Sequence, residues 1–314
     1  MPSRTRSTRN PRAVPVPPMQ RAAPPSRPAA PEGAAPGHPL PDTTATGLRL
    51  LGVDFTSAPR RSKPITAAWG TPLAPGLVRL DSLQPCSDMA AFDALLATPG
   101  PWRGAFDLPF GLPRELVQHL GWPQDWAACL DHYQGLQRPA IAATFQAFCD
   151  ARPAGSKFAH RACDGPAGSS PSMKWVNPPV AFMLHAGVPA LRRASVGLPG
   201  LCPGDPQRQA YEAYPGLVAR ELIGRRSYKS DTRAQQTPER LIARKDLVEA
   251  LEQGRWRGQR VKLGHGQREA LVEDAQGDQL DAVLCLAVAA WSLDQPAAGW
   301  PAGVDPLEGW ILGA

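Results

Sequence analysis

The stretch Leu48-Arg-Leu-Leu-Gly-Val-Asp-Phe55 decides the fold, because it is short, apolar and followed by a small polar loop over 56–59. This pattern predicts a buried strand with Asp54 at its end. Downstream, the sequence predicts strands over 65–69 and 77–83, a helix over 89–97, and a fourth strand over 104–107 that ends at Asp107. Three strands, a helix and a fourth strand are typical of an α/β domain.

Beyond the fourth strand the pattern becomes mainly helical. The segment from 278 to 293 is apolar almost all round, which predicts a buried helix. Other elements are expected as one or two helices over 125–148, helices over 179–193, 215–223 and 238–252, and a short strand over 210–213.

The first 47 residues differ from the rest in composition. They hold twelve of the 37 prolines, six arginines and only two acidic residues, so they carry +4 of the net charge of +6. Proline and the lack of large aliphatic side chains predict a disordered, partly polyproline-like arm. Two interpretations stay open, an extension without function and an arm that tethers nucleic acid. The remaining chain carries only +2, so the basic balance is no argument for nucleic-acid binding by the body.

Several protein classes are excluded by the sequence. The longest apolar run, 282–291, is far shorter than the roughly 18 residues of a membrane span, so no membrane association is expected. Six cysteines are scattered with no C-x-x-C pair and no histidine cluster, which argues against a disulfide framework and a zinc site. We expect reduced, mostly buried thiols and a cytoplasmic protein.

Acidic side chains are placed unusually along the chain. Asp54 and Asp107 end strands, while Asp278 and Asp281 lie at the start of the buried helix. Ligands of α/β sheets gather outside the carboxyl ends of strands, and converging carboxylates repel one another unless a cation offsets them. Hard oxygen ligands suit Mg²⁺ or Mn²⁺, and two such ions about 4 Å apart can activate water on a phosphodiester.

Each acid also has a simpler interpretation. Asp54 and Asp107 could form turns, Asp278 could cap the helix, and Asp281 suits the helix dipole. Glu212, in Tyr-Glu-Ala-Tyr-Pro, is a further catalytic candidate whose alternative is a salt-bridged surface residue. The cations of 225–229 could hold a phosphate or the carboxylates, or form a solvated loop.

A series of motifs along the chain resembles the domain of unknown function 429 family, whose members are regarded as predicted nucleases with a ribonuclease-H-like fold. The resemblance covers 48–314 and excludes the arm. The motifs are Gly52-Val-Asp-Phe-Thr-Ser-Ala-Pro-Arg60, Phe106-Asp-Leu-Pro-Phe-Gly-Leu-Pro113, Lys174-Trp-Val-Asn-Pro-Pro-Val180, Glu212-Ala-Tyr-Pro-Gly216, Tyr228-Lys229, Gly277-Asp-Gln-Leu-Asp-Ala282 and Gly309-Trp-Ile311.

The resemblance implies a mixed sheet flanked by helices, with a largely helical insertion at about 114–207. It implies that Asp54 and Asp107 are the acids of the first and fourth strands, and that Asp278 and Asp281 are paired acids on the last helix. Glu212 falls in a family motif, and we assign Lys229 the stabilisation of charge on a phosphate. Basic and aromatic residues of the insertion are expected to contact substrate: Lys157, His160, Arg161, Lys174 and Trp175.

The function expected is therefore that of a metal-dependent phosphodiester hydrolase, a predicted nuclease that uses clustered carboxylates and two divalent cations. Nucleic acid is the candidate partner, and no protein partner is indicated. One alternative is an ATPase-like phosphotransferase, although a second Gly-rich phosphate loop is missing. The other is a non-catalytic scaffold or binding module, which the small charge of the body favours.

Overall fold

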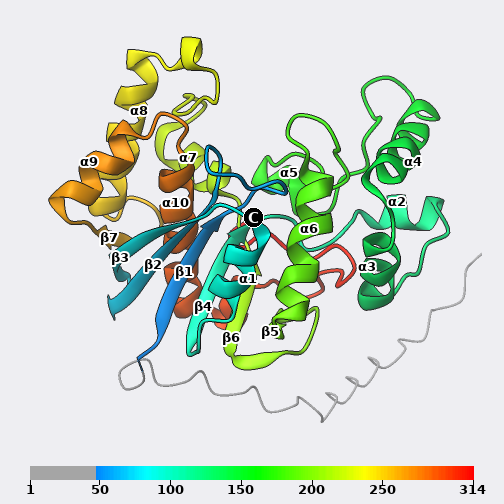
Figure 1. Cartoon of the computed structure of the whole chain (residues 1–314), viewed down its shortest axis with the longest axis horizontal. Helices are drawn as coiled ribbons and strands as arrows, with labels where there is room; N and C mark the ends of the chain where they lie inside the picture. The colour runs from blue at the N-terminus through cyan, green and yellow to red at the C-terminus, as the bar shows by residue number, and fades with distance from the viewer. Residues whose placement is uncertain (1–46) are drawn as a thin grey trace, which may run out of the picture. The chain divides into compact units, whose positions relative to one another are not determined.

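A seven-stranded mixed sheet forms the centre of the computed structural model, which describes residues 47–314 (Figure 1). The strand order across the sheet is β5-β6-β4-β1-β2-β3-β7. The strands are β1 (Arg49–Asp54), β2 (Ile65–Ala74), β3 (Leu77–Cys86), β4 (Trp102–Asp107), β5 (Val196–Gly197), β6 (Asp205–Glu212) and β7 (Arg260–Lys262).

The middle strands bring acidic residues to one edge of the sheet. β1 pairs antiparallel with β2 and parallel with β4, and this parallel register sets Asp54 opposite Asp107. β4 in turn pairs parallel with β6, where Phe106 lies opposite Glu212. Parallel strands end at the same edge, so three acids predicted from separate segments lie along one border.

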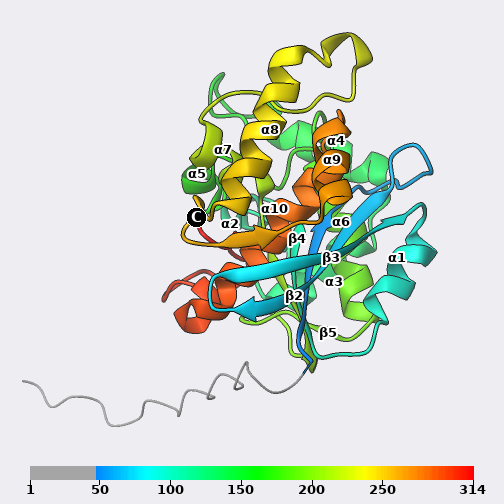
Figure 2. The same ribbon diagram turned by 90° about the vertical axis from the view of Figure 1, so that its left-hand side faces the viewer.

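Helices cover both faces of the sheet because side chains alternate along the central strands. Leu51 of β1 packs into a core with α1, α2, α3, α4 and α6, whereas Leu50 packs into a second core with α7, α8, α9 and α10. Figure 2 shows α8 and α10 on one side of the strands and α1 on the other. The helices are α1 (Met89–Leu96), α2 (Arg114–His119), α3 (Trp126–Gln134), α4 (Arg138–Asp150), α5 (Asp164–Ala167), α6 (Val180–Arg193), α7 (Pro215–Ile223), α8 (Pro238–Glu252), α9 (His265–Glu273) and α10 (Asp278–Trp291), with 3₁₀ turns at η1 (Arg233–Gln235), η2 (Ser292–Asp294) and η3 (Pro296–Gly299).

The last helix, α10, packs unusually close to β1. A Cβ atom added at Gly52 would overlap the carbonyl oxygen of Ala282 and the amide nitrogen of Leu286. Only glycine permits this approach of helix backbone to strand backbone. Since Ala282 follows Asp281, the contact fixes the start of α10 beside the end of β1.

The α/β class and the flanked mixed sheet expected from the sequence are confirmed. The buried last helix is confirmed as α10, and the segment over 125–148 forms two helices, α3 and α4. The strand expected over 210–213 begins earlier, as β6, and the sequence pattern missed β5, β7 and α9. The helices α2 to α6 come from the segment between β4 and β6.

Three further expectations concern the whole chain. All six cysteines are free and all but Cys202 are buried, which confirms the expected unpaired thiols. Among residues 47–314, none of the helices is long and apolar enough to cross a membrane. The arm predicted over 1–47 lies, apart from Gly47, outside the described residues.

Candidate metal centre

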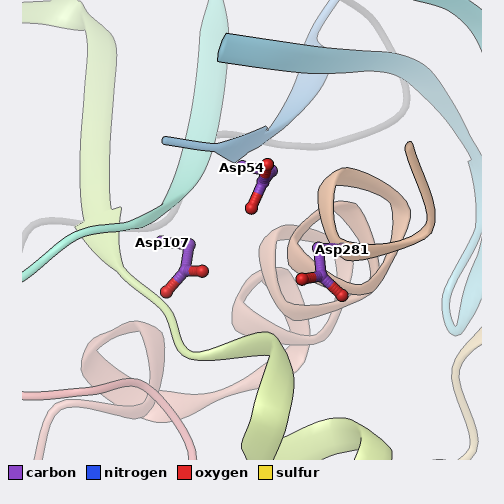
Figure 3. Close-up of side chains that lie close together, drawn as sticks. All are labelled: Asp54, Asp107 and Asp281. Carbon is purple, nitrogen blue, oxygen red and sulfur yellow. The ribbon is translucent and has the colours of Figure 1, made fainter. Parts of the chain in front are cut away.

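Three carboxylates converge where β1, β4 and α10 meet (Figure 3). Asp54 is the last residue of β1, Asp107 is the last residue of β4, and Asp281 lies in the first turn of α10. One carboxylate oxygen from each lies within 4.8 Å of the others. We refer to Asp54, Asp107 and Asp281 as the acidic triad.

Two local features of the sequence bring the triad together. The parallel register of β1 and β4 sets Asp54 beside Asp107, and the missing side chain at Gly52 lets α10 carry Asp281 up to them. Asp54 and Asp281 are buried, and Asp107 is only partly exposed. Buried carboxylates are rare in proteins unless they are paired or bind metal, so this arrangement needs a compensating charge.

Asp281 has two compensating donors. The hydroxyl of Tyr228 donates to Oδ1 of Asp281 at 2.6 Å, and the ammonium of Lys229 donates to Oδ2. Lys229 reaches this position by running past Gly277, whose positive φ of 77° and missing side chain leave room for it. Burial lowers the pKa of Lys229, but the acidic groups around it, chiefly the charge of Asp281, outweigh burial and hold this pKa well above its ordinary value.

Asp54 and Asp107 have no such donors among the described residues: no hydrogen bond from residues 47–314 reaches either carboxylate. Burial, followed by the charge of Asp281, raises the pKa of Asp54 well above its usual value. The same two causes, in the same order, raise the pKa of Asp107 to about 7. Burial and the charge of Asp281 thus outweigh the opposing charge of Lys229, and both acids resist ionisation.

The triad fits a divalent cation of the Mg²⁺ or Mn²⁺ type. It offers only hard carboxylate oxygens, from three separate segments, and two of these side chains lack protein donors. A cation among them would reverse the effect that raises the pKa values of Asp54 and Asp107, since it favours the ionised forms. The expected turn-forming roles of these two acids find no support in the hydrogen bonds of the described residues.

Asp278 lies beside the triad but is not one of the three converging acids. Its Oδ1 accepts a 2.7 Å hydrogen bond from Nζ of Lys63, which also contacts Asp231 at 2.7 Å. The expectation that Asp278 caps the helix is wrong, because the N-cap is Gly277 and Asp278 is the first helical residue. The carboxylate that accepts an amide of this first turn is instead Asp274, from Gln279 at 2.9 Å.

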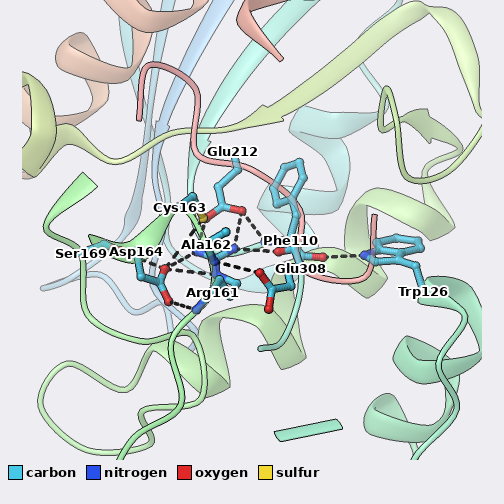
Figure 4. Close-up of polar contacts among 9 residues, drawn as sticks. All are labelled: Phe110, Trp126, Arg161, Ala162, Cys163, Asp164, Ser169, Glu212 and Glu308. Atoms are coloured by element: carbon cyan, nitrogen blue, oxygen red, sulfur yellow. Dashed lines mark hydrogen bonds and ion pairs between the residues drawn. The ribbon is translucent and has the colours of Figure 1, made fainter. Parts of the chain in front are cut away.

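Glu212 is buried in a separate charged network (Figure 4). Both its oxygens accept from the guanidinium of Arg161, at 2.7 and 2.8 Å, and Oε2 also accepts from the amide of Phe110 at 2.9 Å. Arg161 further donates to Asp164 at 2.9 Å. The interpretation of Glu212 as a salt-bridged surface residue is wrong, since Glu212 is paired but buried. Glu212 lies outside the triad, and its catalytic role stays a prediction.

This network also corrects the expectation for Arg161. Its side chain is buried and bound to two acids, so it is not available to contact a substrate. The Arg161 side chain instead joins its own segment to Glu212 at the end of β6. The neighbouring strand, β4, carries Asp107. The network also contacts the end of the chain, since Arg161 donates to the carbonyl oxygen of Glu308 at 3.1 Å.

Two residues at the centre were missed by the sequence reasoning. Lys63 is not among the predicted site residues. Its place in the loop directly after the strand that ends at Asp54 could have indicated a cation beside the acids. Tyr228 has no predicted role beyond its place in a family motif, and its neighbour Lys229 is expected to stabilise charge on a phosphate. In the structure both Tyr228 and Lys229 hold Asp281.

Comparison with known proteins yields one match. The family described as "Protein of unknown function (DUF429)" matches residues 52–304, which is most of the chain and includes the whole acidic triad. No curated protein and no solved structure matches the chain. The protein belongs to the DUF429 family.

Proposed function

We propose that this protein is a phosphodiester hydrolase that depends on Mg²⁺ or Mn²⁺, a nuclease with a ribonuclease-H-like domain over 48–314. The observation that carries the proposal is the convergence of Asp54, Asp107 and Asp281 within 4.8 Å. The strand arrangement supports it, because β1 pairs antiparallel with β2 and parallel with β4, and both acid-bearing strands end together. Open α/β sheets bind their ligands outside the carboxyl ends of their strands, which is where Asp54 and Asp107 lie.

Each residue of the centre receives a role. Asp54, Asp107 and Asp281 would hold the cations, which when bound supply positive charge at the phosphate and an activated water. Tyr228 and Lys229 fix the orientation of Asp281 through its two oxygens. The Lys229 side chain is still 40% exposed, so its ammonium is also able to face a phosphate oxygen.

Asp278 and Glu212 receive supporting roles in this proposal. Asp278 is held by Lys63, which ties the loop after β1 to the start of α10 and so keeps Asp54 and Asp281 in register. Glu212 binds Arg161 and the amide of Phe110, which lies in the loop that directly follows Asp107. Both therefore act on the triad through the backbone that carries it.

A non-catalytic scaffold is the second candidate, and one observation favours it. The ammonium of Lys229 already compensates Asp281, as it would in a purely structural ion pair. In a scaffold, the raised pKa values of Asp54 and Asp107 would favour the protonated, uncharged carboxyls. Metal-dependent activity separates the two candidates.

The test is a cleavage screen with labelled single-stranded, duplex, hybrid and branched nucleic acids, each with Mg²⁺, Mn²⁺ or EDTA. We expect metal-dependent cleavage that Asp54→Asn and Asp281→Asn reduce by more than the roughly 10- to 100-fold typical of residues that only support a metal ligand. The matched control is Asp150→Asn, an exposed acid at the end of α4. Cleavage that survives in Asp54→Asn contradicts the proposal, and ATP consumption without cleavage identifies a phosphotransferase instead.

We also propose a cytoplasmic location. Its support is the set of six free cysteines, since reduced thiols are typical of a reducing compartment. Thiol labelling of the protein isolated from its source without reductant tests this, with full labelling after denaturation as the expected result.

A further inference from the structure

A pocket of about 580 Å³ lies on the segment between β4 and β6, away from the acidic triad. Its volume falls in the range of roughly 300–1,000 Å³ found for small-molecule sites. No member of the triad lines it. Its walls come from α2 and from the loop that follows α4, and the residues are Glu115, Arg152, Gly155, Ser156, Lys157, Phe158 and His160.

The charge of the pocket is positive and only partly compensated. Arg152 forms an ion pair with Glu115, donates to the carbonyl oxygen of Ser156 at 2.7 Å, and lies over the ring of Phe148. Lys157 and His160 are exposed, and within residues 47–314 neither forms an ion pair or a side-chain hydrogen bond. Arg152 is thus a fixed wall, while Lys157 and His160 are available to an anionic ligand.

An aromatic ring lies among these polar side chains. Phe158 is half-buried, and its ring packs against that of Trp175 with centroids 5.8 Å apart and planes tilted by 51°. This contact holds the ring of Phe158, which also lines the pocket. A cation-lined groove with an aromatic platform is the arrangement that binds phosphates and stacks an unpaired base.

The pocket is anchored to the edge of the sheet that carries the triad. His160 is followed directly by Arg161, whose guanidinium binds Glu212 at the end of β6. Glu212 lies opposite Phe106 in the sheet, and Phe106 directly precedes Asp107. The pocket and the triad are thus connected through Arg161 and Glu212, and we expect a polymer, rather than a small phosphoester, to occupy both.

We propose that this pocket binds a nucleotide of single-stranded nucleic acid, with the base against Phe158 and the phosphate against Lys157 and His160. The inference rests on the proposed function for its substrate, and it narrows that substrate to a polymer with unpaired bases. A duplex keeps its bases stacked and paired, so its bases do not reach a half-buried ring. The pocket holds the polymer and takes no part in bond breaking.

The experiment measures binding of a 5′-labelled oligothymidylate to the full chain by fluorescence anisotropy in EDTA, so that no cleavage takes place. The variants are Phe158→Leu, which keeps an apolar contact with Trp175 but removes the ring, and Lys157→Glu. The matched control is Lys245→Glu, which makes the same charge change at an exposed residue of α8. Thermal melting of every variant verifies that it is folded.

We expect Phe158→Leu to weaken binding by about tenfold, since stacking on one aromatic ring contributes about that much. Lys157→Glu is expected to weaken binding because it places a negative charge beside the phosphate. Lys245→Glu is expected to change binding much less, and a labelled duplex to lose nothing from Phe158→Leu. Equal binding by wild type and Phe158→Leu, or a loss as large in Lys245→Glu, overturns the inference, as does absence of binding by the wild type. If the two pocket variants lose binding as expected but the wild type cleaves no substrate with any metal, the inference about the pocket is supported and the proposed hydrolase activity is refuted.

Discussion

Tyr228 donates a 2.6 Å hydrogen bond from its hydroxyl to Oδ1 of Asp281, a carboxylate with no exposed surface. Together with Lys229 on Oδ2, this bond lets a charged group exist inside the protein. Burial and the neighbouring Asp281 raise the pKa of Tyr228 well above its ordinary value, so the hydroxyl keeps its proton and remains a donor. The acidic triad thus has one acid held by protein donors and two acids without them.

Removal of this hydroxyl is the first prediction. Tyr228→Phe is expected to lower the free energy of unfolding by about 1–3 kcal/mol, because a buried carboxylate oxygen loses its donor. Urea unfolding measures the change. The matched control is Tyr214→Phe, since the hydroxyl of Tyr214 forms no hydrogen bond within residues 47–314. An equal effect of the two substitutions contradicts the role given to Tyr228.

Addition of metal is the second prediction. Millimolar Mn²⁺ or Mg²⁺ is expected to raise the melting temperature of the wild type, because a ligand at about 100 times its Kd adds about 2.7 kcal/mol of stability. Asp54→Asn and Asp107→Asn are expected to lose this response, since each removes a triad oxygen that lacks a protein donor. Asp150→Asn is expected to keep it. Melting curves with EDTA as the reference decide, and an unchanged response in Asp54→Asn refutes the metal centre.

The third prediction concerns pH. The pKa of Asp107 is raised from 3.8 to about 7, so the folded protein holds this proton more tightly than the unfolded chain. In EDTA the free energy of unfolding is therefore expected to fall as pH rises from about 4 to 7, by up to about 1.4 kcal/mol per pH unit. Asp107→Asn is expected to flatten this dependence, which urea unfolding at several pH values measures. Stability that rises over this range in wild type but not in the variant contradicts the assigned pKa.

The fourth prediction tests the contact between β1 and α10. Gly52→Ala is expected to cost about 1–3 kcal/mol or more, because the added methyl group overlaps backbone atoms that cannot move aside easily. Gly266→Ala, the same change on α9, where nothing lies within 4 Å of the added methyl, is expected to stabilise the protein by about 0.5–1 kcal/mol. Chemical unfolding of both variants checks the opposite signs. Two shifts of the same sign would rule out the proposed close packing.

The buried pair of Arg161 and Glu212 gives the fifth prediction. Arg161→Met is expected to destabilise the protein by about 3–5 kcal/mol, because two acids are left buried without their partner. Arg193→Met, which removes an exposed pair with Asp93, is expected to change stability by less than about 1 kcal/mol. A double variant Arg161→Met, Glu212→Gln is expected to recover part of the loss. Additive effects of the two changes would show that the residues do not act as a pair.

The parts of the fold that were predictable are those with a strong local pattern. β1 and α10 are almost wholly buried, so their uninterrupted apolar residues mark them in the sequence. The short edge strand β7 has three residues and, within residues 47–314, pairs only with β3. The helix α9 is mostly exposed, so neither element carries a marked pattern. When an element forms because of its contacts with a neighbouring element, its own sequence carries little local pattern.

The candidate site divides in the same way. Asp54, Asp107 and Asp281 were predicted because each ends or begins an element that the sequence marks clearly. The partners of Glu212 and Asp278 were not predicted, because Arg161 and Lys63 lie 51 and 215 residues away along the chain. Pairings over such separations depend on how whole elements dock, and no local spacing encodes them.

The packing of α10 on β1 has a consequence for the order of events during biosynthesis. Asp54 and Asp107 belong to the first strands made, whereas Asp281 belongs to the last helix. A chain emerging from the ribosome therefore carries the carboxyls of β1 and β4 without the third acid until α10 has been synthesised. The acidic triad is therefore complete only after α10 has been synthesised and has packed against β1.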